Sequence, residues 1–192
     1  MSNEKFQNYL EDQLLIAMPQ LRDPYFANTV TYLWKHSDEG ALGVVINKPL
    51  KTSLADIFGE LGITCSIDEA PFKQRKVLAG GPVEREKGFI IHDSSKTWNA
   101  SIKISDGINI STSRELLQDI ADGKGPDRYF VVLGCAGWDA GQLEQEITAN
   151  AWLTAPATSE LIFSEDYDNK ADSAAAQLGV NLTQLPPDAG HA

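Results

Sequence analysis

The sequence has few of the residues that form cross-links, metal sites or membrane anchors. Its 192 residues include two cysteines, Cys65 and Cys135, which lie 70 positions apart in neither a CxxC nor a zinc-ribbon spacing, so a disulfide scaffold is not expected. The three histidines are far apart and form no HExxH-type pair, so no metal site is predicted. No apolar run approaches the roughly 20 residues of a membrane span, and the acidic start is unlike a signal peptide. We therefore expect a cytoplasmic protein with no membrane contact.

Positive charge is also scarce. Lys and Arg number 16 against 27 Asp and Glu, which gives a formal net charge of -11. The segment 139–192 contributes most of the excess, because it carries nine acidic residues and a single lysine, Lys170. Nucleic-acid binding depends on several Lys or Arg contacts with phosphate groups, which a surface of this sign repels. Direct nucleic-acid binding is therefore disfavoured, and an unknown small molecule or protein is the expected partner.

The length predicts one domain, because 192 residues suit one substantial core and no repeat or flexible linker divides the chain. The ends, residues 1–12 and 186–192, are expected to be loosely ordered. Strand patterns cover 14–19, a hairpin at 29–47, 76–83, 88–93, a hairpin at 100–111, 128–134 and 160–164. Helix patterns cover 53–62, 113–123, 139–151 and 169–180, with caps at Ser53, Ser113 and Asp139. Strands outnumber helices and are interleaved irregularly, which favours an α+β fold over a doubly wound parallel sheet.

The stretch GCAGWDAGQLEQEI, residues 134–147, is predicted to be a strand end, a glycine turn and a helix. Cys135 would be a reactive thiol only if a cation, a histidine or the helix N-terminus lowered its pKa. The helix is predicted to begin near Asp139, with Gln142 at capping-box spacing, and that carboxylate would compete for the positive end. GCAG also lacks the GxSxG spacing of a hydrolase elbow. We favour a small turn residue at Cys135, with a thiol-dependent or redox enzyme as the alternative.

The glycine turns are the other candidate site. They either present backbone N–H groups to a ligand or permit tight bends in the chain. Neither GxGxxG nor GxxxxGK[ST] occurs, so no nucleotide cofactor is predicted. The predicted ligand or partner surface consists of Asn47, Gly80, Gly81, Pro82, His92, Gly134, Gly137, Trp138, Gly141 and Gln142. No nucleophile with a partner base emerges among them, which favours a binding role over catalysis.

Several stretches in the same order resemble the AlgH/YqgE family of bacterial proteins. They are LLIAMPQLRDPYFANTVTYLWKHSDEGALGVVINKP (14–49), LAGGPV with GFIIHD (within 78–93), LGCAGWDAGQLEQEITANAWL (133–153) and the closing GHA (190–192). The resemblance implies a compact α+β domain with a bifurcated, partly barrel-like β-sheet surrounded by helices. It also implies a role in transcriptional regulation, suggested for the family by a link to alginate production, without an established biochemical activity.

The sequence departs from the family pattern at Cys135, where family members often carry an aromatic residue such as tyrosine. A chemistry common to the family therefore cannot depend on this thiol. We predict a non-enzymatic binding or regulatory protein that uses its glycine-rich turns as a ligand or partner surface.

Overall fold

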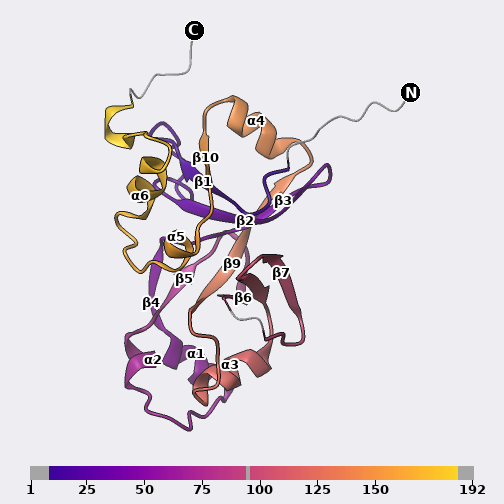
Figure 1. Cartoon of the computed structure of the whole chain (residues 1–192), viewed down its shortest axis with the longest axis vertical. Helices are drawn as coiled ribbons and strands as arrows, with labels where there is room; N and C mark the ends of the chain where they lie inside the picture. The colour runs from indigo at the N-terminus through magenta and orange to yellow at the C-terminus, as the bar shows by residue number, and fades with distance from the viewer. Residues whose placement is uncertain (1–8, 94–95, 186–192) are drawn as a thin grey trace, which may run out of the picture.

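The computed structural model of the chain describes residues 9–93 and 96–185, which form ten strands and six α-helices (Figure 1). The strands are β1 (Gln13–Ala17), β2 (Val30–Ser37), β3 (Gly40–Val45), β4 (Pro49–Ser53), β5 (Lys76–Ala79), β6 (Val83–His92), β7 (Ser101–Ser105), β8 (Ile108–Ser111), β9 (Tyr129–Asp139) and β10 (Trp152–Pro156). The helices are α1 (Leu54–Leu61), α2 (Ala70–Gln74), α3 (Arg114–Ala121), α4 (Gln142–Thr148), α5 (Ser159–Phe163) and α6 (Lys170–Ala176), followed by a 3-10 turn at Leu182–Gln184. Of the ends predicted to be loosely ordered, 1–12 and 186–192, the structure describes only residues 9–12, and the family-like GHA also lies outside the described residues.

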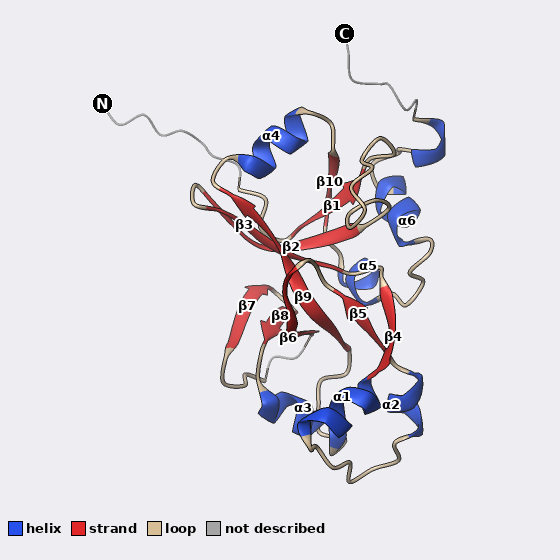
Figure 2. Ribbon diagram, turned by 180° about the vertical axis from the view of Figure 1, so that it is seen from behind, coloured by secondary structure: helices blue, strands red, loops and turns tan. Residues whose placement is uncertain are grey.

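The strands form one forked sheet, and β9 belongs to both of its branches (Figure 2). The first part of β9 pairs antiparallel with β6 and parallel with β5, and its last part pairs antiparallel with β3. The β3 branch continues through β2 and β1 to β10, and the β6 branch continues through β8 to β7, with β4 beyond β5. This confirms the predicted α+β fold with a bifurcated sheet. The fork places two differently oriented sheets in one domain.

The fork separates three apolar cores. The central core lies between the two branches, where Tyr32 of β2 and Val132 of β9 are buried together with residues of α5 and α6. A second core lies under α1, α2 and α3 on the outer side of the β6 branch and includes Val131. A third lies under α4 on the outer side of the β3 branch and includes Leu33. Successive side chains of a strand point to opposite faces, which is why neighbours such as Val131 and Val132 belong to different cores.

Two of the predicted helix caps form as the sequence indicates. The Ser53 hydroxyl accepts from the Asp56 N–H at 3.2 Å while the Asp56 carboxylate accepts from the Ser53 N–H at 2.7 Å, which completes a capping box at α1. Gly62 ends α1 in the left-handed region, with φ 64°. The Ser113 hydroxyl accepts from the Leu116 N–H at 3.3 Å and caps α3. These local signals confirm the predicted positions of both helices.

The predicted strand end at Gly134 is wrong, because β9 runs on to Asp139. Gly134 has φ 78°, so the strand bends there and continues its pairing along β3. α4 begins only at Gln142, after the left-handed Gly141, and has no side-chain cap. Of the predicted capping box, the structure keeps the bond from the Asp139 N–H to Gln142 Oε1, at 3.0 Å. The thiol therefore lies inside a strand and not in a strand-to-helix turn.

The predicted strand at 160–164 is also wrong, since this segment forms α5. The Thr158 hydroxyl accepts from the Leu161 N–H at 3.3 Å and starts the helix. A short apolar run has no period that separates a strand from a buried helical turn. The strand that pairs with β1 at the edge of the sheet is β10. Strands β4 and β10 and helix α2 had no counterpart among the predicted elements.

Candidate functional site

The two glycine-rich segments meet at the fork, in what we call the glycine crossing: Gly80, Gly81 and Gly134. The Gly80 N–H donates to the Leu133 carbonyl at 2.8 Å. A Cβ atom on Gly80 would lie 2.3 Å from the Gly134 oxygen, and one on Gly81 would lie 2.1 Å from the Cys135 carbonyl. A Cβ on Gly134 would lie 2.5 Å from the Gly81 oxygen. Backbone therefore fills the space between the segments, and only glycine permits this approach.

Polar side chains fasten the chain around the glycine crossing. The Tyr25 hydroxyl donates to the Gly81 carbonyl at 3.0 Å, and the Lys48 ammonium donates to the Tyr25 carbonyl at 2.8 Å. Asn47 accepts from the Val30 N–H at 2.8 Å and donates to the Asn28 carbonyl at 3.0 Å. The predicted surface residue Asn47 thus joins the start of β2 to the end of the β2–β3 hairpin. Its polar atoms are already used within the fold.

Cys135 lies in the central core and is only 3% exposed. Burial is the main cause that raises the pKa of its thiol, and the nearby Glu84 acts in the same direction. Burial also raises the pKa of Cys65. A thiol that is held protonated and out of solvent is a poor nucleophile. The structure gives no support to the alternative of a thiol-dependent enzyme, and it corrects the interpretation of Cys135 as a turn residue.

Trp138 and Trp152 anchor α4 through a single carboxylate. The two indole N–H groups donate to Glu146 Oε2 at 2.9 and 2.8 Å, and the Gln142 side-chain amide donates to Oε1 at 2.9 Å. The rings are edge-on at 6.0 Å, and Phe26 packs against both. Trp152 is a core residue, and so is Trp138, which was predicted to lie on a ligand surface and is only 6% exposed. We call this packed and hydrogen-bonded side of the sheet the closed face.

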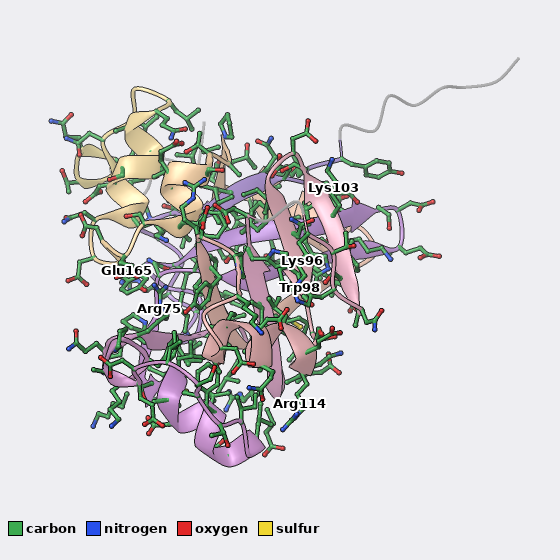
Figure 3. All side chains as sticks on the ribbon, turned by 60° about the horizontal axis from the view of Figure 1, so that its bottom comes forward. Arg75, Lys96, Trp98, Lys103, Arg114 and Glu165 are labelled. Atoms are coloured by element: carbon green, nitrogen blue, oxygen red, sulfur yellow. The ribbon has the colours of Figure 1, made fainter. Side chains whose placement is uncertain are left out.

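His92 lies at the end of β6 and is completely buried. Its ring is edge-on to Trp98 at 5.2 Å, and neither ring nitrogen has a hydrogen-bond partner among the described residues. Burial lowers the pKa of His92, although the charge of Asp93 acts in the opposite direction. The Trp98 N–H and the Lys96 ammonium both donate to Asp119 at 2.8 Å, and Lys96 lies over the Trp98 ring (Figure 3). His92 thus lies beneath an indole that is held in place.

A bulge interrupts β6 next to the glycine crossing. Val83 pairs with Cys135 and Gly88 pairs with Leu133, so four residues of β6, 84–87, stand opposite Gly134 alone. These four residues, which we call the β6 bulge, are all charged and all exposed. Because the glycine crossing fixes where β6 begins, it also fixes where the bulge leaves the sheet.

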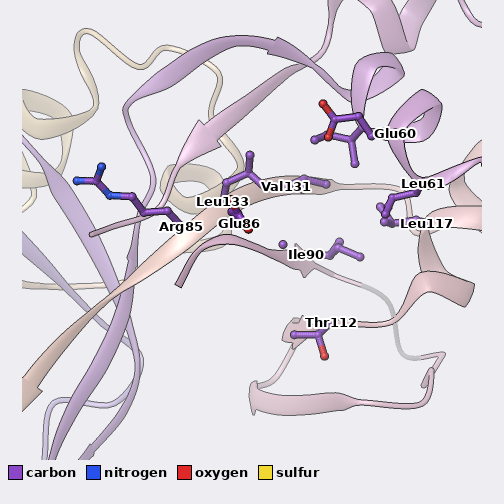
Figure 4. Close-up of a pocket in the computed structure, with 11 residues that line it drawn as sticks. Glu60, Leu61, Arg85, Glu86, Ile90, Thr112, Leu117, Val131 and Leu133 are labelled. Carbon is purple, nitrogen blue, oxygen red and sulfur yellow. The ribbon is translucent and has the colours of Figure 1, made fainter. Parts of the chain in front are cut away.

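A cavity of about 420 Å³ lies between α1, α3 and β6, beside this bulge (Figure 4). We call it the α1–β6 cavity. Its apolar wall consists of Ile57, Leu61, Gly88, Ile90, Leu117, Val131 and Leu133. Its polar rim consists of Glu60, Arg85, Glu86 and Thr112. It opens on the side of the sheet that α1, α2 and α3 cover, which we call the open face.

None of the predicted site residues lines the α1–β6 cavity. The structure brings Gly80, Gly81 and Gly134 together in the crossing, with Asn47 among the polar side chains around it, while His92, Trp138, Gly141 and Gln142 lie elsewhere. Pro82 and Gly137 are exposed beside the fork. A surface of these residues that binds a ligand stays a prediction. The charged run EREK between a glycine turn and a strand, residues 84–87, was the one local signal that pointed toward the cavity.

Comparison with known proteins identifies the family. The family model described as AlgH-like matches residues 14–183. The chain belongs to the AlgH-like family. It is 46% identical over 182 residues to a UPF0301 protein of Alcanivorax borkumensis, covering 95% of this chain and 96% of that protein. It is 42% identical over 183 residues to a UPF0301 protein of Xanthomonas oryzae pv. oryzae, with the same coverage.

Solved structures agree with the AlgH-like assignment. The solution structure of the AlgH protein from Pseudomonas aeruginosa is 40% identical, covers the whole of both chains and superposes with a TM-score of 0.79. A crystal structure of a Corynebacterium diphtheriae protein is 16% identical and superposes with a TM-score of 0.70 over 88% of this chain and 86% of that one, which shows the same fold alone. In residues 9–93 and 96–185 of the AlgH-like chain, no helix is long and apolar enough to cross a membrane. The same residues contain no group of three or more His, Cys, Asp or Glu placed to hold a metal ion.

Proposed function

We propose that this AlgH-like protein is a non-enzymatic binding protein whose ligand occupies the α1–β6 cavity. The observation that carries the proposal is the cavity itself, which has an apolar wall, a polar rim and a volume of about 420 Å³. Sites for small molecules are typically concave and mostly apolar, with a few polar groups, and measure roughly 300–1,000 Å³. The cavity therefore suits a small molecule.

The composition of the cavity supports binding over catalysis. It is lined by neither cysteine nor histidine. Cys135 lies in the central core, and His92 lies beneath Trp98. Histidine is the commonest general base and cysteine a frequent nucleophile, and the groups that the cavity offers in their place are the carboxylates of Glu60 and Glu86 and the Thr112 hydroxyl. The buried Cys135 and His92 therefore both lie outside the proposed ligand site.

We extend the proposal to a regulatory role in the cytoplasm, exerted through the bound small molecule or a protein partner. The formal net charge of -11 supports this route, because such a surface repels the phosphate groups of DNA and RNA. A mobility shift with DNA that persists at physiological salt would instead support regulation through direct DNA binding.

Differential scanning fluorimetry against a metabolite and nucleotide panel tests the proposal. A ligand that binds only the folded state must raise the melting temperature. Gly88→Val places a side chain in the cavity from its wall, since a Cβ atom there meets only Leu133, at 4.0 Å. Gly59→Ala is the matched control, because a Cβ on this exposed helix residue meets nothing within 4 Å and Gly59 does not line the cavity. We expect a shift that Gly88→Val removes and Gly59→Ala keeps. A panel without any shift, or a shift that Gly88→Val leaves unchanged, contradicts the proposal.

A further inference from the structure

The charges on the rim of the α1–β6 cavity are not equally available. The rim carries one cation, Arg85, and two anions, Glu60 and Glu86. Figure 4 shows the Arg85 guanidinium pointing away from the other lining side chains. It lies over the Tyr25 ring, 5.2 Å from its centre. The cation of the rim is therefore engaged outside the cavity.

The position of Arg85 is fixed by the glycine crossing. Tyr25, on which Arg85 stacks, is held at both its hydroxyl and its carbonyl, by Gly81 and Lys48. Cation–aromatic stacking orients a guanidinium without neutralising its charge. Because the aromatic platform is fastened to the backbone of the fork, the guanidinium has a defined resting place beside the cavity mouth.

The two anions of the rim remain available. Neither Glu60 nor Glu86 forms an ion pair or a side-chain hydrogen bond within residues 9–93 and 96–185, and both residues are exposed. They come from different elements, Glu60 from α1 and Glu86 from the β6 bulge, on either side of the apolar wall. The Thr112 hydroxyl adds a third polar group to the rim. An apolar space bordered by two unpaired carboxylates is complementary to a molecule with an apolar body and a positive end.

We propose that the α1–β6 cavity binds a small organic cation, such as an alkylammonium, whose apolar body contacts Ile90 and Leu133 and whose charge lies between Glu60 and Glu86. This inference rests on the proposed function, since it names the ligand class of the same cavity. The net charge of -11 also favours a cationic ligand, because it attracts cations and repels anions at long range. A carboxylate ligand would meet two like charges, and a neutral ligand would leave both carboxylates unpaired.

The test compares three probes of matched length on the full chain: hexylammonium, 1-hexanol and hexanoate. Binding is followed by the amide NMR signals of cavity residues such as Gly88 and Val131, which also give Kd. We expect hexylammonium to bind more tightly than hexanol, and hexanoate to bind most weakly. In the double variant Glu60→Gln/Glu86→Gln, the affinity for hexylammonium should fall at least about three-fold, as expected for two exposed ion pairs, while that for hexanol stays the same.

The control Glu39→Gln/Glu160→Gln removes the same charge from exposed positions that do not line the cavity, and it should retain the wild-type order of affinities. Hexanoate binding as tightly as hexylammonium, or a double variant with unchanged hexylammonium affinity, overturns the cation proposal. If hexanol still moves the cavity signals in that case, the proposed binding function stands. If no probe moves them and the panel yields no shift that depends on Gly88, both proposals fail.

Discussion

The closed face and the open face cover opposite branches of one forked sheet and differ in how their polar groups are satisfied. On the closed face, Glu146 accepts hydrogen bonds from both indoles and from Gln142, and the rings of Phe26, Trp138 and Trp152 pack together. On the open face, His92 lacks hydrogen-bond partners among the described residues, and the α1–β6 cavity remains unfilled by side chains. A site that binds a ligand needs free volume and free polar groups, and the α1–β6 cavity provides both on the open face.

The largest effect is expected at the glycine crossing, because it positions both faces. In Gly81→Ala the new Cβ would lie 2.1 Å from the Cys135 carbonyl, and the backbone must shift on both sides of the fork. We expect the free energy of unfolding to fall by more than about 4 kcal/mol, or the protein not to fold. Urea unfolding measures the change. Gly88→Ala is the matched control, with its Cβ 4.0 Å from Leu133, and should fold normally. Equal stability of the two variants would contradict the structural role of the crossing.

The second-largest loss of stability is expected for Glu146→Ala, a substitution that affects the closed face alone. Glu146→Ala removes the acceptor of both indole N–H groups, which then lose their hydrogen bonds while the rings remain buried. We expect a loss of about 2–3 kcal/mol, since an unsatisfied buried donor costs about 1–3 kcal/mol. Urea unfolding followed by tryptophan fluorescence reports the loss. Glu146→Gln retains one acceptor oxygen and should lose about half as much. A change under about 0.5 kcal/mol in Glu146→Ala would show that the face does not depend on this carboxylate.

On the open face, the prediction concerns how the free energy of unfolding depends on pH through His92. Burial lowers the pKa of His92 in the folded state below its ordinary value of 6.5, so the unfolded chain binds the proton more tightly. This contribution to stability is fully present above pH 6.5 and is lost as the pH falls from 6.5 toward the folded pKa, with a slope of at most about 1.4 kcal/mol per pH unit. His92→Phe should be at least as stable as the wild type at pH 7.5, because both ring nitrogens lack hydrogen-bond partners among the described residues.

Urea unfolding of both proteins between pH 5.5 and 7.5 gives the comparison. Their difference in stability should increase as the pH falls. A constant difference across this range would exclude His92 as the cause of the pH dependence. Carboxylates whose pKa is lowered in the fold, such as Asp119, lose their contribution only at more acidic pH, as the pH falls from about 4 through their folded pKa.

The smallest effect is expected for a substitution that adds a side chain to the α1–β6 cavity and so makes the packing of the open face more like that of the closed face. Gly88→Val places a β-branched side chain in the cavity, on a strand where glycine is unfavourable. We expect a gain of about 0.5–1 kcal/mol in unfolding free energy from the stiffer unfolded chain and the added apolar contact. Thermal unfolding without ligand detects the gain. A loss of stability would mean that the cavity wall cannot accept a side chain at this position.

The parts of this fold that the sequence predicts are those with local causes. Ser53 and Asp56 cap α1 through bonds within four residues, and the alternation of Val30 and Tyr32 with their neighbours follows directly from the two faces of a strand. The end predicted for β9 at Gly134 was wrong because a glycine after an apolar run indicates a turn locally. Here its conformation is set by close contact with Gly81, more than fifty residues away.

The candidate cavity could not be predicted for the same reason. Its lining comes from four separate segments, 57–61, 85–90, 112–117 and 131–133, and no local pattern joins them. The predicted surface consists of residue types that often bind ligands, but Asn47 and Trp138 use their polar groups inside the fold. The two glycine segments stand out in the sequence, and in the structure they lie in contact. Their contact shapes the fork, and the fork sets the position of the cavity.

The shared strand β9 also determines how the molecule can come apart. Its backbone completes the β3 branch at one end and the β6 branch at the other. If either branch separated, the adjoining part of β9 would lose a row of interstrand hydrogen bonds, and the glycine crossing would lose its close contacts. We therefore expect local opening to be confined to the outer strands and helices, and the centre to unfold as a whole. We expect the two faces, which differ in packing, to unfold as a single cooperative unit because they share β9.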